Sequence, residues 1–147
     1  TRRSSDLGHY MTNRPDGLGA HLLVDLYGCP GELLNDLERL QEVTLRACRE
    51  AGATVLDSTF RSFEPQGVSG IVLVAESHFS FHAWPEHGYL ALDFFTCGQT
   101  VQPRRAMEIF IDAFQPARWE SSLHARGQAL ATPLDKAGRP PLFNSRP

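Results

Sequence analysis

A dense set of polar and ionisable side chains lies in the part of the chain that is richest in strand-forming residues. They are Ser69, Glu76, Ser77, His78, His82, Trp84, Glu86, His87 and Cys97. Hydroxyl, thiol and imidazole groups serve enzymes as nucleophiles and proton carriers. Several kinds of chemistry therefore compete as interpretations, and the spacing of these residues separates them.

Three histidines within ten residues suggest a metal site at first. His78 and His82, however, are separated by an aromatic–serine–aromatic run, an alternation typical of a strand. Residues four apart on a strand lie about 13 Å from each other, beyond the reach of one metal ion. Pro85 and the aromatic alternation disfavour the helix that would bring the two imidazoles together. We therefore expect no metal at these residues.

The serines could instead belong to a hydrolase. The chain has no Gly-x-Ser-x-Gly turn after a strand, and its elements do not predict the parallel sheet on which that turn occurs. From residue types alone, the commoner roles remain the stronger interpretation: strand hydroxyls, hydrogen-bonded histidines and a small buried cysteine.

The composition indicates one compact domain. A chain of 147 residues with a formal net charge of −3 can bury a core without a disulfide or a structural metal. Cys29, Cys48 and Cys97 lack a C-x-x-C spacing, which favours a reducing cytoplasm over a disulfide framework. No stretch approaches the ~18 apolar residues of a membrane span. The acidic character of residues 17–98 disfavours nucleic acid as a partner and tolerates a small cationic substrate.

Apolar periodicity predicts the secondary structure. Strands are expected at 18–27, 53–63, 68–75, 78–84, 89–97 and near 117–124, and helices at about 33–51 and 104–114. Short turns rich in Pro and Gly should make neighbouring strands antiparallel. This order predicts an α+β, two-layer sandwich with both helices on one face of a mainly antiparallel sheet. We expect one catalytic domain at 17–125, between poorly ordered ends at 1–16 and 126–147.

One long ordered string changes the balance between these interpretations. The run GVSGIVLVAESHFSFHAWPEHGY at 67–89, followed by DFFTCG at 93–98, closely resembles the bacterial S-adenosylmethionine decarboxylase proenzymes, which are pyruvoyl enzymes. The resemblance extends upstream through 19–29 and 51–55. It therefore covers roughly residues 18–115, and a string of this length with fixed gaps is far more specific than a short motif.

The resemblance implies that the chain makes its own cofactor by breaking between Glu76 and Ser77. The Ser77 hydroxyl would attack the Glu76 carbonyl, and elimination would leave a pyruvoyl group on residue 77 that can form a Schiff base with a substrate amine. Ser69 is expected to stabilise the intermediate of this processing, and His82 to transfer a proton in it. The resemblance brings in no metal.

The resemblance also implies roles in decarboxylation. Loss of carbon dioxide from an amino acid leaves a carbanion that needs an electron sink, which the pyruvoyl group would supply. Cys97 is expected to return a proton to that carbon, Glu86 to hold the ribose hydroxyls and Phe63 to stack on adenine. Relatives of this size work as homodimers with active sites near the subunit contact, so a homodimer of processed chains is expected.

The chain departs from its relatives at Ala20, Phe79, Ala83 and His87, where they usually have Arg, Leu, Thr and Tyr. These positions border the expected pocket but spare the cleaving and decarboxylating residues. We therefore predict a self-processing, pyruvoyl-dependent carboxy-lyase that converts S-adenosylmethionine to the aminopropyl donor for spermidine synthesis. A pyruvoyl-dependent L-ornithine or L-arginine decarboxylase and a non-cleaving, non-catalytic binding partner remain alternatives.

Overall fold

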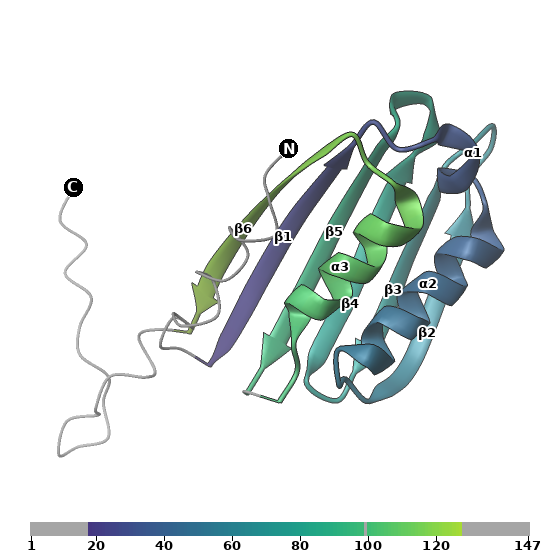
Figure 1. Ribbon diagram of the computed structural model, residues 1–147. Helices are drawn as coiled ribbons and strands as arrows, with labels where there is room; N and C mark the ends of the chain where they lie inside the picture. Colours follow the sequence, from purple (N-terminus) through teal and green to yellow (C-terminus); the bar gives the residue numbers. More distant parts are fainter. Residues whose placement is uncertain (1–17, 99, 128–147) are drawn as a thin grey trace, which may run out of the picture.

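The computed structural model describes residues 18–98 and 100–127 as one α+β unit of two layers (Figure 1). Six strands form one sheet: β1 (Gly19–Tyr27), β2 (Val55–Ser62), β3 (Val68–Val74), β4 (Ser77–Trp84), β5 (Tyr89–Cys97) and β6 (Arg118–Arg126). The helices are α1 (Gly31–Leu34), α2 (Leu37–Glu50), α3 (Pro103–Phe114) and a 3₁₀ turn, η2 (Pro85–His87). The predicted fold class is confirmed.

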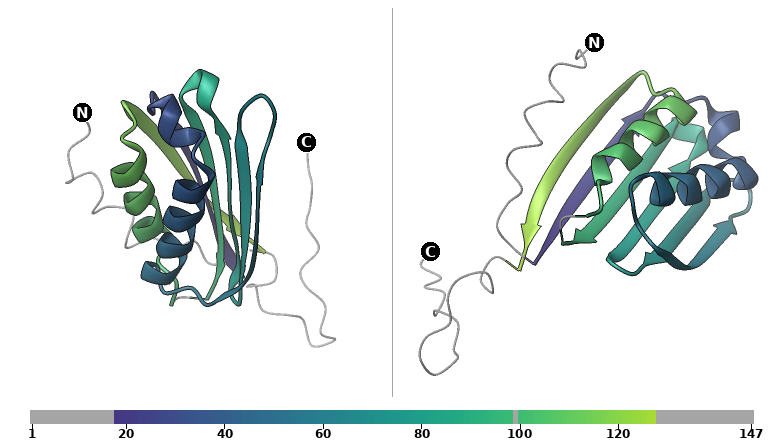
Figure 2. Two further views of the ribbon diagram at one scale, coloured as in Figure 1. Left: turned by 90° about the vertical axis from the view of Figure 1, so that its right-hand side faces the viewer. Right: turned by 60° about the horizontal axis from the view of Figure 1, so that its bottom comes forward.

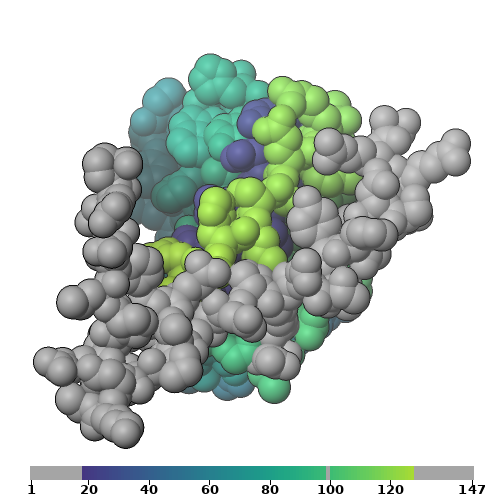
Figure 3. Space-filling view, turned by 90° about the vertical axis from the view of Figure 1, so that its left-hand side faces the viewer, coloured from purple at the N-terminus to yellow at the C-terminus, as the bar shows by residue number. Residues whose placement is uncertain are grey.

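The sheet has the strand order β2-β3-β4-β5-β1-β6, and every neighbouring pair is antiparallel. Both long helices cover the same face, which Figure 2 shows most clearly in its left-hand view. The opposite face of the sheet carries no helix in the described part of the chain. We call these the covered face and the open face. β6 is the outermost strand on one side and lies beside β1 (Figure 3).

The core lies between the covered face and the helices. Aromatic side chains from the central strands meet those of α3, with the ring centroids of Phe94 and Phe110 5.9 Å apart and those of Phe79 and Phe94 4.8 Å apart. α2 contributes the buried Leu40 and Val43. Side chains of the central strands alternate between buried and accessible. Each central strand therefore turns apolar side chains towards the core on the covered face and places its remaining side chains on the open face.

The first helical segment differs from its prediction. We expected one helix from about 33 to 51, but the structure has the short α1, a break at residues 35–36, and then α2. The reason is local: the Asp36 carboxylate accepts a hydrogen bond from the Arg39 backbone N–H at 3.0 Å and caps a new helix. A turn was predicted at Pro85, Glu86 and His87, and it forms the 3₁₀ turn η2.

The predicted poorly ordered ends lie almost wholly outside the described residues, so that expectation stays a prediction for 1–16 and 128–147. β6 extends the predicted last strand to Arg126. Within residues 18–98 and 100–127, no helix combines the length and apolar character needed to cross a bilayer.

Candidate active site

The predicted site residues fall into two groups at opposite ends of the central strands. Glu76, Ser77 and Cys97 lie where β3 turns into β4 and where β5 ends. Ser69 and His82 lie near the start of β3 and the end of β4. Ser77 and His82 are five residues apart on one strand, a separation of about 16 Å. One chain therefore does not bring all of its predicted processing residues together.

The junction between Glu76 and Ser77 is held by main-chain and side-chain contacts. The Cys97 backbone N–H donates to the Glu76 carbonyl oxygen at 2.9 Å. The Glu76 carboxylate accepts a hydrogen bond from the Thr54 backbone N–H at 3.2 Å. Ser77 pairs with Thr96 in the β4–β5 register and has a φ of +149°. That backbone region is essentially reserved for glycine, so the serine at this junction is strained.

Cys97 differs from the other two cysteines in exposure. Its side chain is exposed at the end of β5, whereas Cys29 and Cys48 are buried. Burial raises the pKa of Cys29 to about 11 and the pKa of Cys48 to about 12. The two buried residues act as small apolar core groups, as expected for cysteine in general, and Cys97 is the accessible thiol.

At the other end of β4, Ser69 and His82 are hydrogen-bonded. The Ser69 Oγ lies 2.7 Å from the His82 Nδ1, and either group can donate, depending on the imidazole tautomer. A hydroxyl paired with an imidazole can pass a proton to or from a reacting group. The structure thus brings together two of the residues that the sequence assigned to processing.

The two predicted substrate-binding residues lie beyond that same end. Phe63 follows β2 and is 48% exposed, and its backbone N–H donates to the Gly67 carbonyl oxygen at 2.8 Å. Glu86 is exposed in η2, one residue after the proline that opens the turn. Both side chains are therefore free to meet a ligand from the side of Ser69 and His82.

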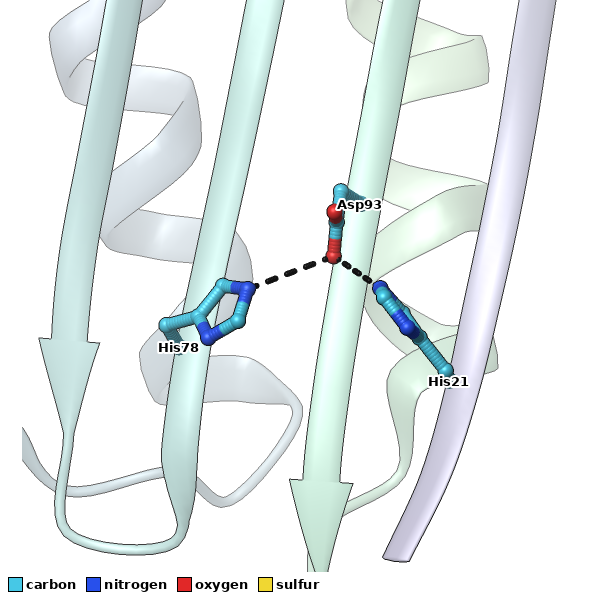
Figure 4. A group of neighbouring side chains, drawn as sticks. All are labelled: His21, His78 and Asp93. Carbon is cyan, nitrogen blue, oxygen red and sulfur yellow. Dashed lines mark hydrogen bonds and ion pairs between the residues drawn. The ribbon is translucent and has the colours of Figure 1, made fainter. Parts of the chain in front are cut away.

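A third cluster on the open face was missed by the sequence analysis as a site. His21 of β1 and His78 of β4 flank Asp93 of β5, and both imidazoles point at its carboxylate (Figure 4). His21 and His78 both pair with Phe95 in the strand register, so they lie on opposite sides of β5. One indication was available: Asp93 is the single carboxylate in the otherwise apolar run YLALDFFTC.

The two-layer α+β fold, the strained Ser77 junction and the exposed Cys97 thiol are the features expected of a small self-processing enzyme. The model of the S-adenosylmethionine decarboxylase family matches residues 20–127. The chain belongs to that family.

Individual relatives agree with this assignment. The S-adenosylmethionine decarboxylase proenzyme of Moorella thermoacetica is 44% identical over 110 residues, which cover 75% of this chain and 88% of the relative. That of Carboxydothermus hydrogenoformans is 50% identical over 88 residues, covering 60% and 69%. The crystal structure of the adenosylmethionine decarboxylase from Aquifex aeolicus is similar with a TM-score of 0.72 and 38% identity, and the match covers 77% of this chain and 93% of that chain.

Proposed function

We propose that this chain is a self-processing decarboxylase that uses a pyruvoyl group made from Ser77 and acts on S-adenosylmethionine, giving the aminopropyl donor for spermidine synthesis. The observation that carries the proposal is the hydrogen bond from the Cys97 N–H to the Glu76 carbonyl oxygen, 2.9 Å long, at the strained Ser77. A donor at a carbonyl that is about to be attacked stabilises the charge that develops on its oxygen.

Self-cleavage would begin when the Ser77 Oγ attacks the Glu76 carbonyl carbon. The negative charge would develop on the oxygen that the Cys97 N–H already contacts. Transfer of the acyl group from the Ser77 nitrogen to its oxygen breaks the peptide bond, and strain at Ser77 favours that step. Elimination then frees the Glu76 carboxylate, and hydrolysis of the remaining enamine releases ammonia and leaves a pyruvoyl group on residue 77.

The site has the parts that the pyruvoyl group would need. When present, that group supplies the electron sink for the carbanion left by decarboxylation. The Cys97 thiol is exposed beside the junction, where it can donate a proton to carbon. Glu86 would accept hydrogen bonds from the ribose hydroxyls, and Phe63 would stack on the adenine; both side chains are exposed.

The separation of the two groups supports a shared site between two copies of the chain. His82 lies about 16 Å from Ser77 along β4, and Ser69 pairs with His82 on the neighbouring strand. Both are therefore too far from Ser77 to act on it within one chain. A two-fold axis running between two stacked open faces, across the strand direction, would set the Ser77 end of one copy against the His82 end of its partner.

The open face has the apolar surface that such stacking requires. Leu23, Ile71, Leu73 and Trp84 are 38–51% exposed on this face. Several large apolar side chains exposed on one uncovered sheet face are typical of an interface. We propose a homodimer of processed chains on this basis, working in the cytoplasm, where the three unpaired cysteines would stay reduced.

The test is the intact mass of the purified protein under denaturing conditions. Wild-type protein should give two chains that break at Glu76/Ser77, the second lighter by one ammonia than a peptide starting with serine. The Ser77→Ala variant should give one uncut chain, because no hydroxyl is left to attack. An uncut wild-type chain, or normal turnover of Ser77→Ala, would reject the proposal.

A further inference from the structure

The cluster of His21, His78 and Asp93 has no part in the proposed chemistry, yet it adjoins the cleavage junction. The Asp93 Oδ1 lies 2.5 Å from the His21 Nε2 and 3.4 Å from the His78 Nε2 (Figure 4). Phe95 packs beside both imidazoles, with ring centroids 5.1 Å from His21 and 5.8 Å from His78. One carboxylate oxygen thus joins strands β1, β5 and β4.

A fourth residue fixes where the protons are. The Arg126 Nη1 lies 3.1 Å from the His21 Nδ1. A guanidinium can only donate, so the Nδ1 must accept, and the proton of the neutral His21 ring is on Nε2, which donates to Asp93. The hydrogen bonds therefore run in one direction, from Arg126 through His21 to Asp93, which also faces the His78 Nε2.

The direction of these hydrogen bonds distinguishes a metal site from a hydrogen-bonded anchor. One nitrogen of each histidine and one carboxylate oxygen of Asp93 lie within 4.8 Å of one another, a spacing that could also suit the ligands of a metal ion. A metal ligand needs a free lone pair on its nitrogen, but the His21 Nε2 carries the proton while Arg126 occupies the Nδ1 lone pair. The arrangement fits a hydrogen-bonded anchor better than a ligand set.

The anchored residue, His78, directly follows Ser77, the first residue after the cleavage site. The junction already has one main-chain contact, from the Cys97 N–H to the Glu76 carbonyl, and one side-chain contact, from the Thr54 N–H to the Glu76 carboxylate. Both hold the residue before the break. On the other side of the strained Ser77, the His78 side chain is held by its polar contact with Asp93 and by ring contacts with Phe95 and His21.

We propose that Arg126, His21 and Asp93 are positioning residues that clamp His78 and so keep Ser77 in the strained backbone conformation from which it attacks Glu76. This inference rests on the proposed self-cleavage. A strained φ persists only where the surroundings enforce it. Without the clamp, the first residues of β4 relax, the strain at Ser77 is lost before the acyl shift can use it, and cleavage slows.

The main test is the rate of cleavage of freshly synthesised chains, followed by intact mass in a cell-free translation. Asp93→Asn should cleave roughly tenfold more slowly than wild type, equivalent to about 1.4 kcal/mol in the barrier. Asp25→Asn is the matched control, because Asp25 is also a half-buried carboxylate on the open face and accepts a hydrogen bond from Tyr89. The control should cleave within about twofold of wild type.

Rescue separates positioning from a merely structural effect. A glutamine at residue 78 keeps a side-chain N–H that can face Asp93, as the His78 Nε2 does at 3.4 Å, whereas alanine has none. His78→Gln should therefore cleave several-fold faster than His78→Ala. Thermal melting of Asp93→Asn and Asp25→Asn, each in the Ser77→Ala background, checks folding on uncut chains, and the two midpoints should agree within a few degrees.

Hydroxylamine identifies the affected step, since it cuts an accumulated ester directly. It should not speed cleavage of Asp93→Asn, because the clamp acts before the ester forms. Cleavage of Asp93→Asn at the wild-type rate, equal rates for His78→Gln and His78→Ala, or full rescue by hydroxylamine would each overturn the clamp while leaving self-cleavage intact. A wild-type chain that never cuts would overturn the proposed function, and the clamp with it.

Discussion

The two faces of the single sheet use the same strands for different purposes. On β5, Leu92 and Phe94 point into the core, and Asp93 and Phe95, which alternate with them, are half exposed on the open face. The covered face is held by apolar contacts with α2 and α3. The open face carries the junction partner Cys97 and the imidazole clusters. Because successive side chains of a strand point to opposite faces, the same strands can supply core residues to the covered face and polar, reactive residues to the open face.

Several polar side chains of the open face are paired with one another. No buried side-chain nitrogen or oxygen lacks a hydrogen-bond partner within residues 18–98 and 100–127. Near the other end of β5, Tyr89 donates to Asp25, and burial, followed by its contact with Asp25, raises the pKa of Tyr89. The His21–Asp93, Tyr89–Asp25 and Ser69–His82 pairs of the open face can therefore be covered by a second copy without losing their hydrogen bonds.

Thiol labelling should give the largest contrast between the faces. At pH 8, Cys29 and Cys48, with their pKa raised to about 11 and about 12 by burial, have roughly one thiolate in a thousand or fewer. Iodoacetamide should therefore modify Cys97 at least about 100-fold faster than either buried residue, since the thiolate is the reacting form. Raising the pH towards 11 should reduce the difference in labelling rate between Cys97 and the buried cysteines, because the buried thiols then ionise.

Peptide mapping after timed labelling measures the three rates, and urea-unfolded protein is the control in which all three should react alike. Equal labelling of Cys29 and Cys97 in the folded protein would contradict the division between the faces.

Neighbouring phenylalanines of β5 test the same division through stability. Phe94→Ala should cost about 3–5 kcal/mol in the free energy of unfolding, because it empties a fully buried position against Phe110. Phe95→Ala is the matched change on the open face and should cost clearly less. Urea unfolding of both variants in the uncut Ser77→Ala background measures the difference, and similar losses would show that the open face also carries the fold.

The covered face and the antiparallel pairing of strands that follow one another in the chain could be predicted from the sequence, because burial and short turns leave a local pattern. Alternation in β4 and β5, helical spacing in α2 and α3, and Pro/Gly turns each depend on a few neighbouring residues. The break before α2 was missed because one capping side chain, Asp36, outweighed a continuous apolar periodicity.

The candidate site was predictable only in part. Glu76, Ser77 and Cys97 became candidates through the resemblance, but the hydrogen bond that joins them depends on β4–β5 register, which sequence spacing does not supply. The cluster of His21, His78 and Asp93 draws one residue from each of three strands up to 72 positions apart. Such contacts follow from the order of strands in the sheet, and no local pattern marks them.

Removal of the Cys97 side chain should separate two roles of one residue. In Cys97→Ala the backbone N–H to Glu76 remains, so self-cleavage should continue. Turnover per cleaved chain should fall about 100-fold, the usual cost of losing a general acid. Carbon dioxide release from carboxyl-labelled substrate, normalised to the cleaved fraction, measures it. Loss of cleavage with unchanged turnover of the cleaved fraction would reverse the assignment.

The smallest effect is expected from a single apolar side chain in the proposed interface. Leu73 is 51% exposed on the open face, so Leu73→Glu should barely alter folding but should bury a charge when two open faces stack. The dimer dissociation constant should rise by at least about tenfold, measured by sedimentation equilibrium. Leu56→Glu, at the irregularity in the edge strand β2, is the control, since Leu56 is 60% exposed there and should leave the dimer unchanged. If the two variants associate equally well, the copies do not meet through the open face. Ser69 and His82 would then have to approach Ser77 through a different contact between copies.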